Sequence, residues 1–318
     1  MTADPTDHVA PEHWGDGLPC PKCRRVNLPE HSWFVSYFDS NEVRCIGCQE
    51  PFDLWTQALN DLSDMPAPWV AFRLIGAVQS HWKVPIPPEK TSPLDLSIIP
   101  PTAEILHVGI TGYLKGGDAQ ASTFPGLVLM NDLQFDPFPR HLVLYGLSHG
   151  RTNVSTSEAW VTVTWIDPDP DDVSTYHLTD AAKQFAAGRY NRMLMSANIA
   201  VEAALTPALL IWVRRYCRKE DAEDFLGPRG ATYAHQLKVL TQISGKTLGI
   251  GMMAGTLSNL LDDLRRYRND LVHKGALLHK DRPPPSREQA AKFLSAATFG
   301  YHYARYLKDR VEAEGPQS

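Results

Sequence analysis

The chain has 318 residues, of which 43% are hydrophobic and 21% are charged, a balance typical of a folded globular protein with two or three domains. Its acidic, polar N-terminal stretch excludes a secretory signal peptide, so we expect a cytoplasmic protein with reduced cysteines. Residues 1–176 hold 10 Lys and Arg against 22 Asp and Glu, whereas residues 177–318 hold 21 against 14. The basic C-terminal part favours contact with nucleic acid, although ordinary scatter of surface charge produces the same asymmetry.

Two Cys-x-x-Cys pairs, Cys20 with Cys23 and Cys45 with Cys48, dominate the N-terminal region, residues 1–62. Four thiolates at this spacing satisfy tetrahedral Zn²⁺ and leave no open position for catalysis, so we expect a structural zinc ribbon. Two disulfides or four free thiols are the alternatives. A reducing compartment disfavours the disulfides.

The segments between and after the cysteines are expected to be strands and loops. Aromatic and β-branched residues predict strands over 31–38 and 42–45. Residues 63–102 are expected to be a Pro-rich connector. A β-rich, sandwich-like module should fill residues 103–172, of which the acidic end, 167–172, looks like a linker. Its strands are predicted at 104–114, 126–130, 141–147 and 159–166.

Helical spacing takes over in the last part of the chain and predicts an all-α helical bundle over residues 178–314. Thr179 is expected to cap its first helix, and Pro207 to begin a second helix or to kink the first. The apolar stretch 194–213 is long enough to cross a bilayer, but Glu202 would be costly in lipid, so we expect buried helices and no membrane contact. Further helices are predicted over residues 231–243, over 254–273 and after the capping-box sequence 286–289. The expected fold class is therefore multidomain α+β.

The predicted helix over residues 254–273 separates an apolar face from a polar one. Leucines at three- and four-residue spacing form the apolar face, while Arg265, Asn269 and His273, each four residues apart, share the other. A solvated helix end explains this pattern without any chemistry, because a histidine in the last turn is favoured by the helix dipole.

The sequence from Arg268 to His273, RNDLVH, resembles the motif of the HEPN superfamily, which is an Arg, a polar residue, three further residues and a His. Asn269 occupies the polar position, and Asp270 completes the Arg-Asn-Asp form that is often seen. The resemblance includes the order of the surrounding helices and covers about residues 178–312.

This resemblance implies a metal-independent endoribonuclease that acts as a homodimer on RNA. His273 would serve as general base or acid for attack of the 2′-hydroxyl on its own 3′-phosphate, leaving a 2′,3′-cyclic phosphate. Arg268 would bind the scissile phosphate, and Asn269 would orient His273 or bond to the phosphate. Asp270 and Glu202 are supporting candidates, Glu202 by orienting Arg268. Catalysis would need no cofactor.

Helix geometry gives an independent reason for pairing two copies. Five residues at 100° each turn the helix by about 500°, so Arg268 and His273 point about 140° away from each other. Two copies around a twofold axis can supply both groups to one phosphate.

By analogy with the family, the protein is expected to be a toxin or an antiviral defence effector whose N-terminal half senses a protein or phage-derived trigger. The alternative is a non-catalytic HEPN protein that dimerises and binds RNA, with the zinc ribbon recognising a partner or nucleic acid. A DNA-binding regulator is a third hypothesis, which the nearly neutral ribbon disfavours. The intact pair Arg268 and His273 favours the enzyme.

Overall fold

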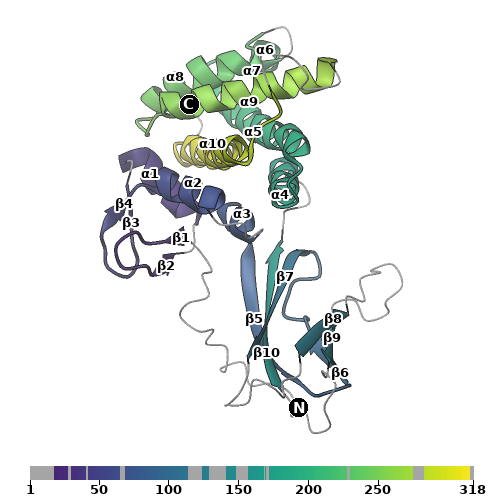
Figure 1. Cartoon of the computed structure of the whole chain (residues 1–318). Helices are drawn as coiled ribbons and strands as arrows, with labels where there is room; N and C mark the ends of the chain where they lie inside the picture. The colour runs from purple at the N-terminus through teal and green to yellow at the C-terminus, as the bar shows by residue number, and fades with distance from the viewer. Residues whose placement is uncertain are drawn as a thin grey trace. The chain divides into compact units, whose positions relative to one another are not determined.

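A computed structural model shows that the chain has a mixed α+β fold (Figure 1). It describes residues 18–27, 30–40, 42–64, 69–113, 124–128, 141–147, 157–167, 169, 172–227, 230–274 and 283–315. Two compact units emerge. We call Ala77–Pro168 the β unit, and we call Gly15–Gly76 together with Asp169–Ser318 the helical unit.

The β unit contains two three-stranded antiparallel sheets. The first has the order β5 (Val78–Ile86), β10 (Ser157–Ile166), β7 (Glu104–Tyr113), and the second has the order β6 (Thr91–Asp95), β9 (His141–Leu147), β8 (Phe124–Val128). The strands predicted from residue 104 onwards are confirmed to within a few residues.

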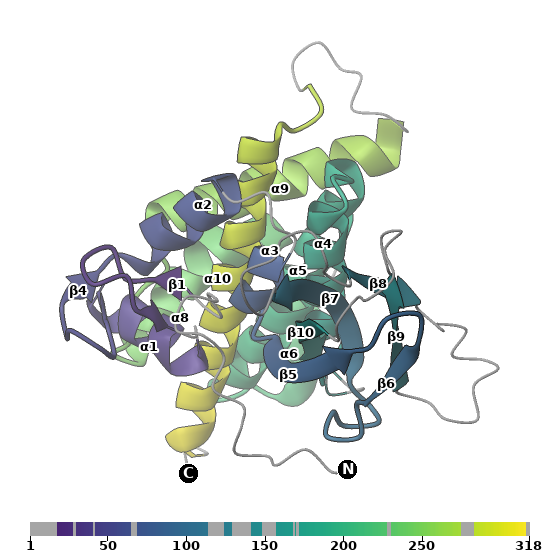
Figure 2. The same cartoon turned by 60° about the horizontal axis from the view of Figure 1, so that its bottom comes forward.

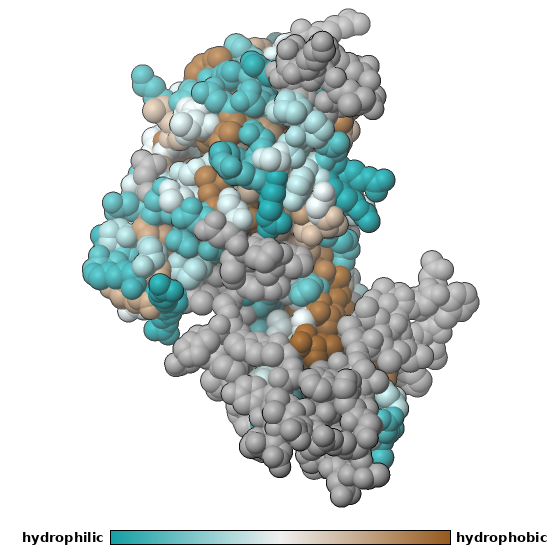
Figure 3. Space-filling model, viewed as in Figure 1, coloured by the Kyte–Doolittle hydropathy of each residue, from teal (hydrophilic) through white to brown (hydrophobic). Residues whose placement is uncertain are grey.

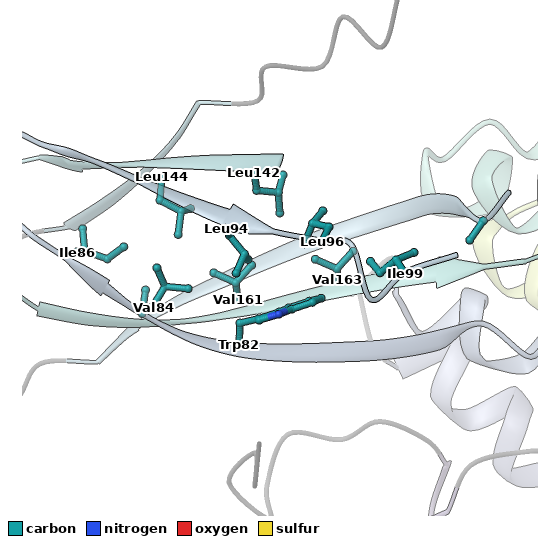
Figure 4. Close-up of a cluster of buried hydrophobic side chains, with 12 residues drawn as sticks. Trp82, Val84, Ile86, Leu94, Leu96, Ile99, Leu142, Leu144, Val161 and Val163 are labelled. Carbon is teal, nitrogen blue, oxygen red and sulfur yellow. The ribbon is translucent and has the colours of Figure 1, made fainter. Parts of the chain in front are cut away.

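The core of the β unit is aliphatic and lies between the two sheets (Figure 4). Alternate residues of β10, Val161 and Val163, are fully buried, as is Leu144 of the central strand β9. Alternate residues of a strand point to the same face, so Val161 and Val163 both contribute to this core.

Residues 63–102, expected to form a connector, contain regular structure. They include the helix α3 (Trp69–Leu74) and the strands β5 and β6. Pro85 and Pro93 lie within these two strands, and each strand is at the edge of its sheet. An edge strand tolerates proline because its outward N–H needs no partner in the ladder, so the prolines hid the strands from sequence analysis.

The helical unit begins with a small N-terminal module, residues 18–64, that carries the four cysteines. Its elements are β1 (Leu18–Pro19), β2 (Val26–Asn27), α1 (His31–Ser40), β3 (Val43–Arg44), β4 (Pro51–Phe52) and α2 (Leu54–Asp64). The predicted strand at 31–38 is wrong, because this segment is the helix α1. Phe34 and Phe38, one turn apart, form its buried face.

The helix α3 and the C-terminal helices make up the rest of this unit. The C-terminal helices are α4 (Val173–Ala186), α5 (Tyr190–Val213), α6 (Lys219–Leu226), α7 (Tyr233–His235), the π-helical turn η1 (Gln236–Leu240), α8 (Thr241–Thr247), α9 (Gly255–Lys274) and α10 (Arg287–Ala313). α5 packs against α4, α9 and α10. It is long and apolar enough to cross a bilayer, and half of its most apolar stretch is buried within the protein, as in a core helix.

Three helix ends differ from the prediction. Asp172, not Thr179, caps α4, because its carboxylate accepts hydrogen bonds from two first-turn amides, and Thr179 is buried inside the helix. α4 ends before Gly188, whose φ of +69° suits glycine. Pro207 lies inside α5 rather than at a helix start. The predicted cap at Ser286 is confirmed.

Aromatic side chains join the N-terminal module to α10, and Figure 2 shows α1 and α2 beside this helix. The Phe299 ring makes edge contacts with Phe34 and Trp55, each at a centroid distance of 5.0 Å. Phe38 packs edge-on against Tyr303 at 5.1 Å. The module is therefore an integral layer of the helical unit and not a separate domain.

Candidate functional site

The four cysteines of the N-terminal module form one cluster that could hold a metal ion. Their sulfurs all lie within 4.8 Å of one another. The Cys20 and Cys48 sulfurs are 3.7 Å apart, and those of Cys23 and Cys45 are 3.6 Å apart. Four sulfurs around zinc, each at about 2.3 Å, would be separated by about 3.8 Å. All four residues are free thiols, so the donor set and its dimensions fit a tetrahedral metal ion such as Zn²⁺.

The first pair of cysteines lies on a tight turn that follows β1. The Cys20 amide donates to the Arg25 carbonyl at 2.9 Å, and the Arg24 amide donates to the Cys20 carbonyl at 3.0 Å. Arg24 has a left-handed φ of 60°. The Lys22 amide points at the Cys20 sulfur, 3.4 Å away, as it would at a thiolate ligand.

The second turn repeats the first, residue for residue. The Cys45 amide donates to the Glu50 carbonyl at 3.0 Å, and the Gln49 amide donates to the Cys45 carbonyl at 2.9 Å. Gln49 has a φ of 61°, and the Gly47 amide lies 3.3 Å from the Cys45 sulfur. Two turns with the same hydrogen bonds, meeting at four sulfurs, are what a metal clamped by two knuckles requires.

The two cysteines of the second turn differ in their electrostatics. A backbone hydrogen bond at Glu50 lowers the pKa of Cys48, but burial and the neighbouring cysteines outweigh it and raise the pKa to about 11, whereas Cys45 favours the thiolate. Burial raises the pKa of Cys45, but hydrogen bonds from the backbone amides of Cys48 and Gly47 outweigh it and bring the pKa down to about 6. A thiolate is the form that binds metal, so the backbone prepares this sulfur for an ion.

The N-terminal module also touches the loop that leads into α9. The Asp39 carboxylate, at the end of α1, accepts hydrogen bonds from the Gly251 amide and the Tyr306 hydroxyl. A Cβ at Gly251 would lie 1.7 Å from the Phe38 carbonyl oxygen, so only glycine fits there. The module thus helps to fix the chain just before the helix that carries the predicted catalytic residues.

The predicted catalytic residues occupy the C-terminal end of α9. Arg268 and Asn269 are half-buried, and Arg268 Nη1 donates to Asn269 Oδ1 at 3.1 Å. The Arg268 Nε is buried and has no hydrogen-bond partner among the described residues. Asp270 is half-buried in the same turn. His273 lies in the last turn of α9, but its side chain is outside the described part of the structure.

The structure places Glu202 elsewhere than expected. It is exposed on α5, and its carboxylate accepts a 3.4 Å hydrogen bond from Asn198, one turn earlier on the same helix. Within the described residues Glu202 does not bond to Arg268. It lies instead beside Tyr233: burial raises the pKa of Tyr233 well above its usual range, the Glu202 charge raises it further, and Arg265 lowers it.

A buried carboxylate on α9, that of Asp262, was not predicted from the sequence; its side chain is 4% exposed. Its Oδ1 accepts from Arg265 Nε and Nη2 at 3.0 and 2.8 Å. Its Oδ2 accepts from Lys238 Nζ at 2.7 Å and from Arg266 Nη2 at 2.9 Å. Burial raises the pKa of Asp262, but the bonds from Lys238 and Arg265 outweigh it and hold the pKa at about 2. The arginines three and four residues after Asp262 were a visible signal, whereas Lys238 was not.

Comparison with known proteins adds no relative: no family model, curated protein or solved structure matches this chain. The function must therefore be argued from the two sites themselves.

Proposed function

We propose that the protein is a metal-independent endoribonuclease of HEPN type, in which the four-cysteine cluster holds a structural zinc ion. The observation that supports this most is the state of Arg268. One of its donors bonds to Asn269, and its Nε has no partner among the residues that the structure describes. An anionic phosphate oxygen is the acceptor that a guanidinium with free donors binds best.

In this proposal, Arg268 binds the scissile phosphate and stabilises the charge that develops on it. His273, five residues later on α9, exchanges protons with the 2′-hydroxyl or the leaving 5′-oxygen. The products are a 2′,3′-cyclic phosphate and a 5′-hydroxyl. Because the two side chains leave one helix about 140° apart, we propose that two chains pair through the helical unit and complete each site.

The zinc ion has a structural task only. Cys20, Cys23, Cys45 and Cys48 would fill its tetrahedral shell and leave no position for water or substrate. The ion would stabilise the N-terminal module and, through Asp39, the loop before α9.

We further propose that the protein works in the cytoplasm as a toxin or antiviral effector. The acidic N-terminal part of the sequence, which includes the β unit, would recognise a protein or phage-derived trigger. This role is tested by expressing the wild type and the His273→Ala variant in a host and then adding phage as the trigger. Growth arrest that needs His273 supports an RNA-cleaving toxin, and unchanged growth with both chains after adding phage contradicts it.

The chemistry is tested with the purified chain and a labelled RNA in buffer with EDTA. The metal content of the protein is measured in parallel, so that loss of the structural ion is not mistaken for a catalytic requirement. We expect cleavage by the wild type, and rates lower by about 10²-fold or more for His273→Ala and Arg268→Gln. His177→Ala, on α4, is the matched control and should cleave normally.

Full cleavage by His273→Ala would contradict the proposal. RNA binding without cleavage by the wild type would instead favour a non-catalytic RNA-binding protein.

A further inference from the structure

Three cationic side chains converge on the buried carboxylate of Asp262. One negative charge therefore faces three positive charges. The excess positive charge is accessible to solvent, because the side chains of Lys238, Arg265 and Arg266 are 41%, 26% and 47% exposed. Asp263 lies 3.8 Å from Arg266, but it is 54% exposed, so water screens that pair.

A purely structural role explains only one of the three cations. Lys238 comes from η1 and ties that turn to α9. Arg265 and Arg266 lie on α9 with Asp262, so their bonds to it join no second element. Asp262 does, however, hold both guanidinium groups in place, while several of their donors make no hydrogen bond to any described residue.

The backbone conformation of η1 supports a functional role for this cluster. Residues Gln236–Leu240 form a π-helical turn, which is rare and occurs frequently at functional sites. This turn carries Lys238 to within hydrogen-bond distance of Asp262, 24 residues later in the chain.

The cluster lies on the same face of α9 as Asn269 and His273, two of the three proposed catalytic residues. Arg265 precedes Asn269 by four residues and His273 by eight, so at 1.5 Å per residue it lies about 6 and 12 Å before them along the helix. Figure 3 shows hydrophilic side chains over much of the helical unit on the face that it presents. A single-stranded chain that reaches His273 can therefore continue over Arg265.

We infer that Lys238, Arg265 and Arg266 form a subsite for the phosphodiester backbone of single-stranded RNA, about two to three helical turns from His273. The choice of RNA as ligand rests on the proposed function. The subsite binds phosphates next to the scissile one and sets the register of the strand, and it recognises no base.

The test is the affinity for a labelled oligonucleotide of 2′-O-methyl RNA, which has no attacking hydroxyl and so separates binding from cleavage. The double variant Lys238→Gln, Arg266→Gln should raise the Kd on the order of tenfold, because two charge-assisted contacts are lost. The slope of log Kd against log salt should become less steep by about 1.4, at about 0.7 for each lost contact to a single strand.

The matched control replaces an exposed lysine and an exposed arginine elsewhere in the helical unit. In the double variant Arg214→Gln, Lys292→Gln the original side chains are 35% and 41% exposed, and each is paired with a glutamate. This control should bind as the wild type does. The exchange Lys238→Arg, Arg266→Lys keeps both charges and should restore binding, which separates charge from folding.

Equal affinity of the glutamine double variant and its control would overturn the subsite, as would failure of the wild type to bind the oligonucleotide. Cleavage of unmodified RNA is measured on the same proteins. A wild type that binds through this cluster but leaves RNA intact would contradict the proposed ribonuclease and keep the subsite.

Discussion

The β unit builds its core from one continuous stretch of chain, whereas the helical unit joins an N-terminal module to helices that follow the β unit in sequence. The first core is aliphatic and lies between two sheets (Figure 4). In the helical unit, the junction between the N-terminal module and the C-terminal helices is aromatic and centres on Phe299 of α10. This difference suggests that damage to the metal cluster should spread to the C-terminal helices and spare the β unit. Four predictions test it, from the largest expected effect to the smallest.

Removing the metal should cause the largest change. Cys45→Ser, or strong chelation, should lower the metal content from about one ion per chain and unfold the N-terminal module, because metal binding and folding are linked in such clusters. Hydrogen exchange should rise in α1 and α10 while β10 remains protected. Cys217→Ser is the control, since this fifth cysteine is exposed and outside the cluster. Equal loss of protection in β10 would refute the comparison.

Truncating Phe299 should cost about 3–5 kcal/mol of unfolding free energy and should also weaken metal binding, because the module loses its aromatic anchor. Its counterpart in the β unit is Leu144→Ala. This change should cost about 2–5 kcal/mol and leave the metal affinity unchanged. Denaturant unfolding measures the loss of unfolding free energy in both variants, and metal titration measures their metal affinity. A Phe299→Ala protein with normal metal affinity would show that the module folds on its own.

Acid should loosen the same junction through a pair of histidines. His31 Nδ1 and His302 Nδ1 are 3.0 Å apart, so only one proton fits between them, and His302 is stacked on Phe34 at 3.7 Å. Burial lowers the pKa of His302 well below 6.5, and the neighbouring His31 and Arg305 lower it further. Burial also lowers the pKa of His31, with help from Arg305 and against the opposing charge of Asp309.

The sign follows from which state takes up the proton. Below pH 6.5 the unfolded histidine takes up a proton, whereas folded His302, whose pKa is well below 6.5, takes it up only at lower pH. Stability is therefore complete above pH 6.5 and falls below it, by up to about 1.4 kcal/mol per pH unit for this excluded proton. A His302→Gln variant should have a flatter profile between pH 6.5 and 5. An unchanged profile would exclude this pair as the cause.

The smallest effect is expected at the first helix of the C-terminal part. Asp172 caps α4 by accepting from the Ser174 and Thr175 amides at 2.9 and 3.1 Å. Asp172→Ala should cost about 1 kcal/mol, and Asp172→Asn less, because an amide oxygen still caps the helix. Thermal unfolding can resolve the two variants. A cost above that of Phe299→Ala would mean that the cap, and not the aromatic junction, dominates this unit.

The parts of the fold that could be predicted are those set by local spacing. Two Cys-x-x-Cys pairs predicted the four-cysteine cluster that could hold a metal ion, and the capping sequence at Ser286 predicted the start of α10. The helix α1 was missed because its aromatic residues favour strands, while the decisive fact is that Phe34 and Phe38 pack against a helix from the other end of the chain. Tertiary contact overrode local propensity there.

The candidate site could be predicted only in part, for the same reason. Arg268, Asn269 and His273 were visible as a motif on one helix. The bond between Lys238 and Asp262 joins residues far apart in sequence through a π-helical turn, and no local pattern predicts either. Asp262 itself is a charged residue in a buried position of α9, which the spacing of apolar and polar residues does not predict.

The most direct test of the account is the chemistry of RNA ends. A defined RNA is incubated in EDTA with the wild type and, separately, with His273→Ala, and the termini of the fragments are identified. The account predicts 2′,3′-cyclic phosphates and 5′-hydroxyls from the wild type and intact RNA from the variant. Fragments with 5′-phosphates, or the same fragments from both proteins, would contradict it.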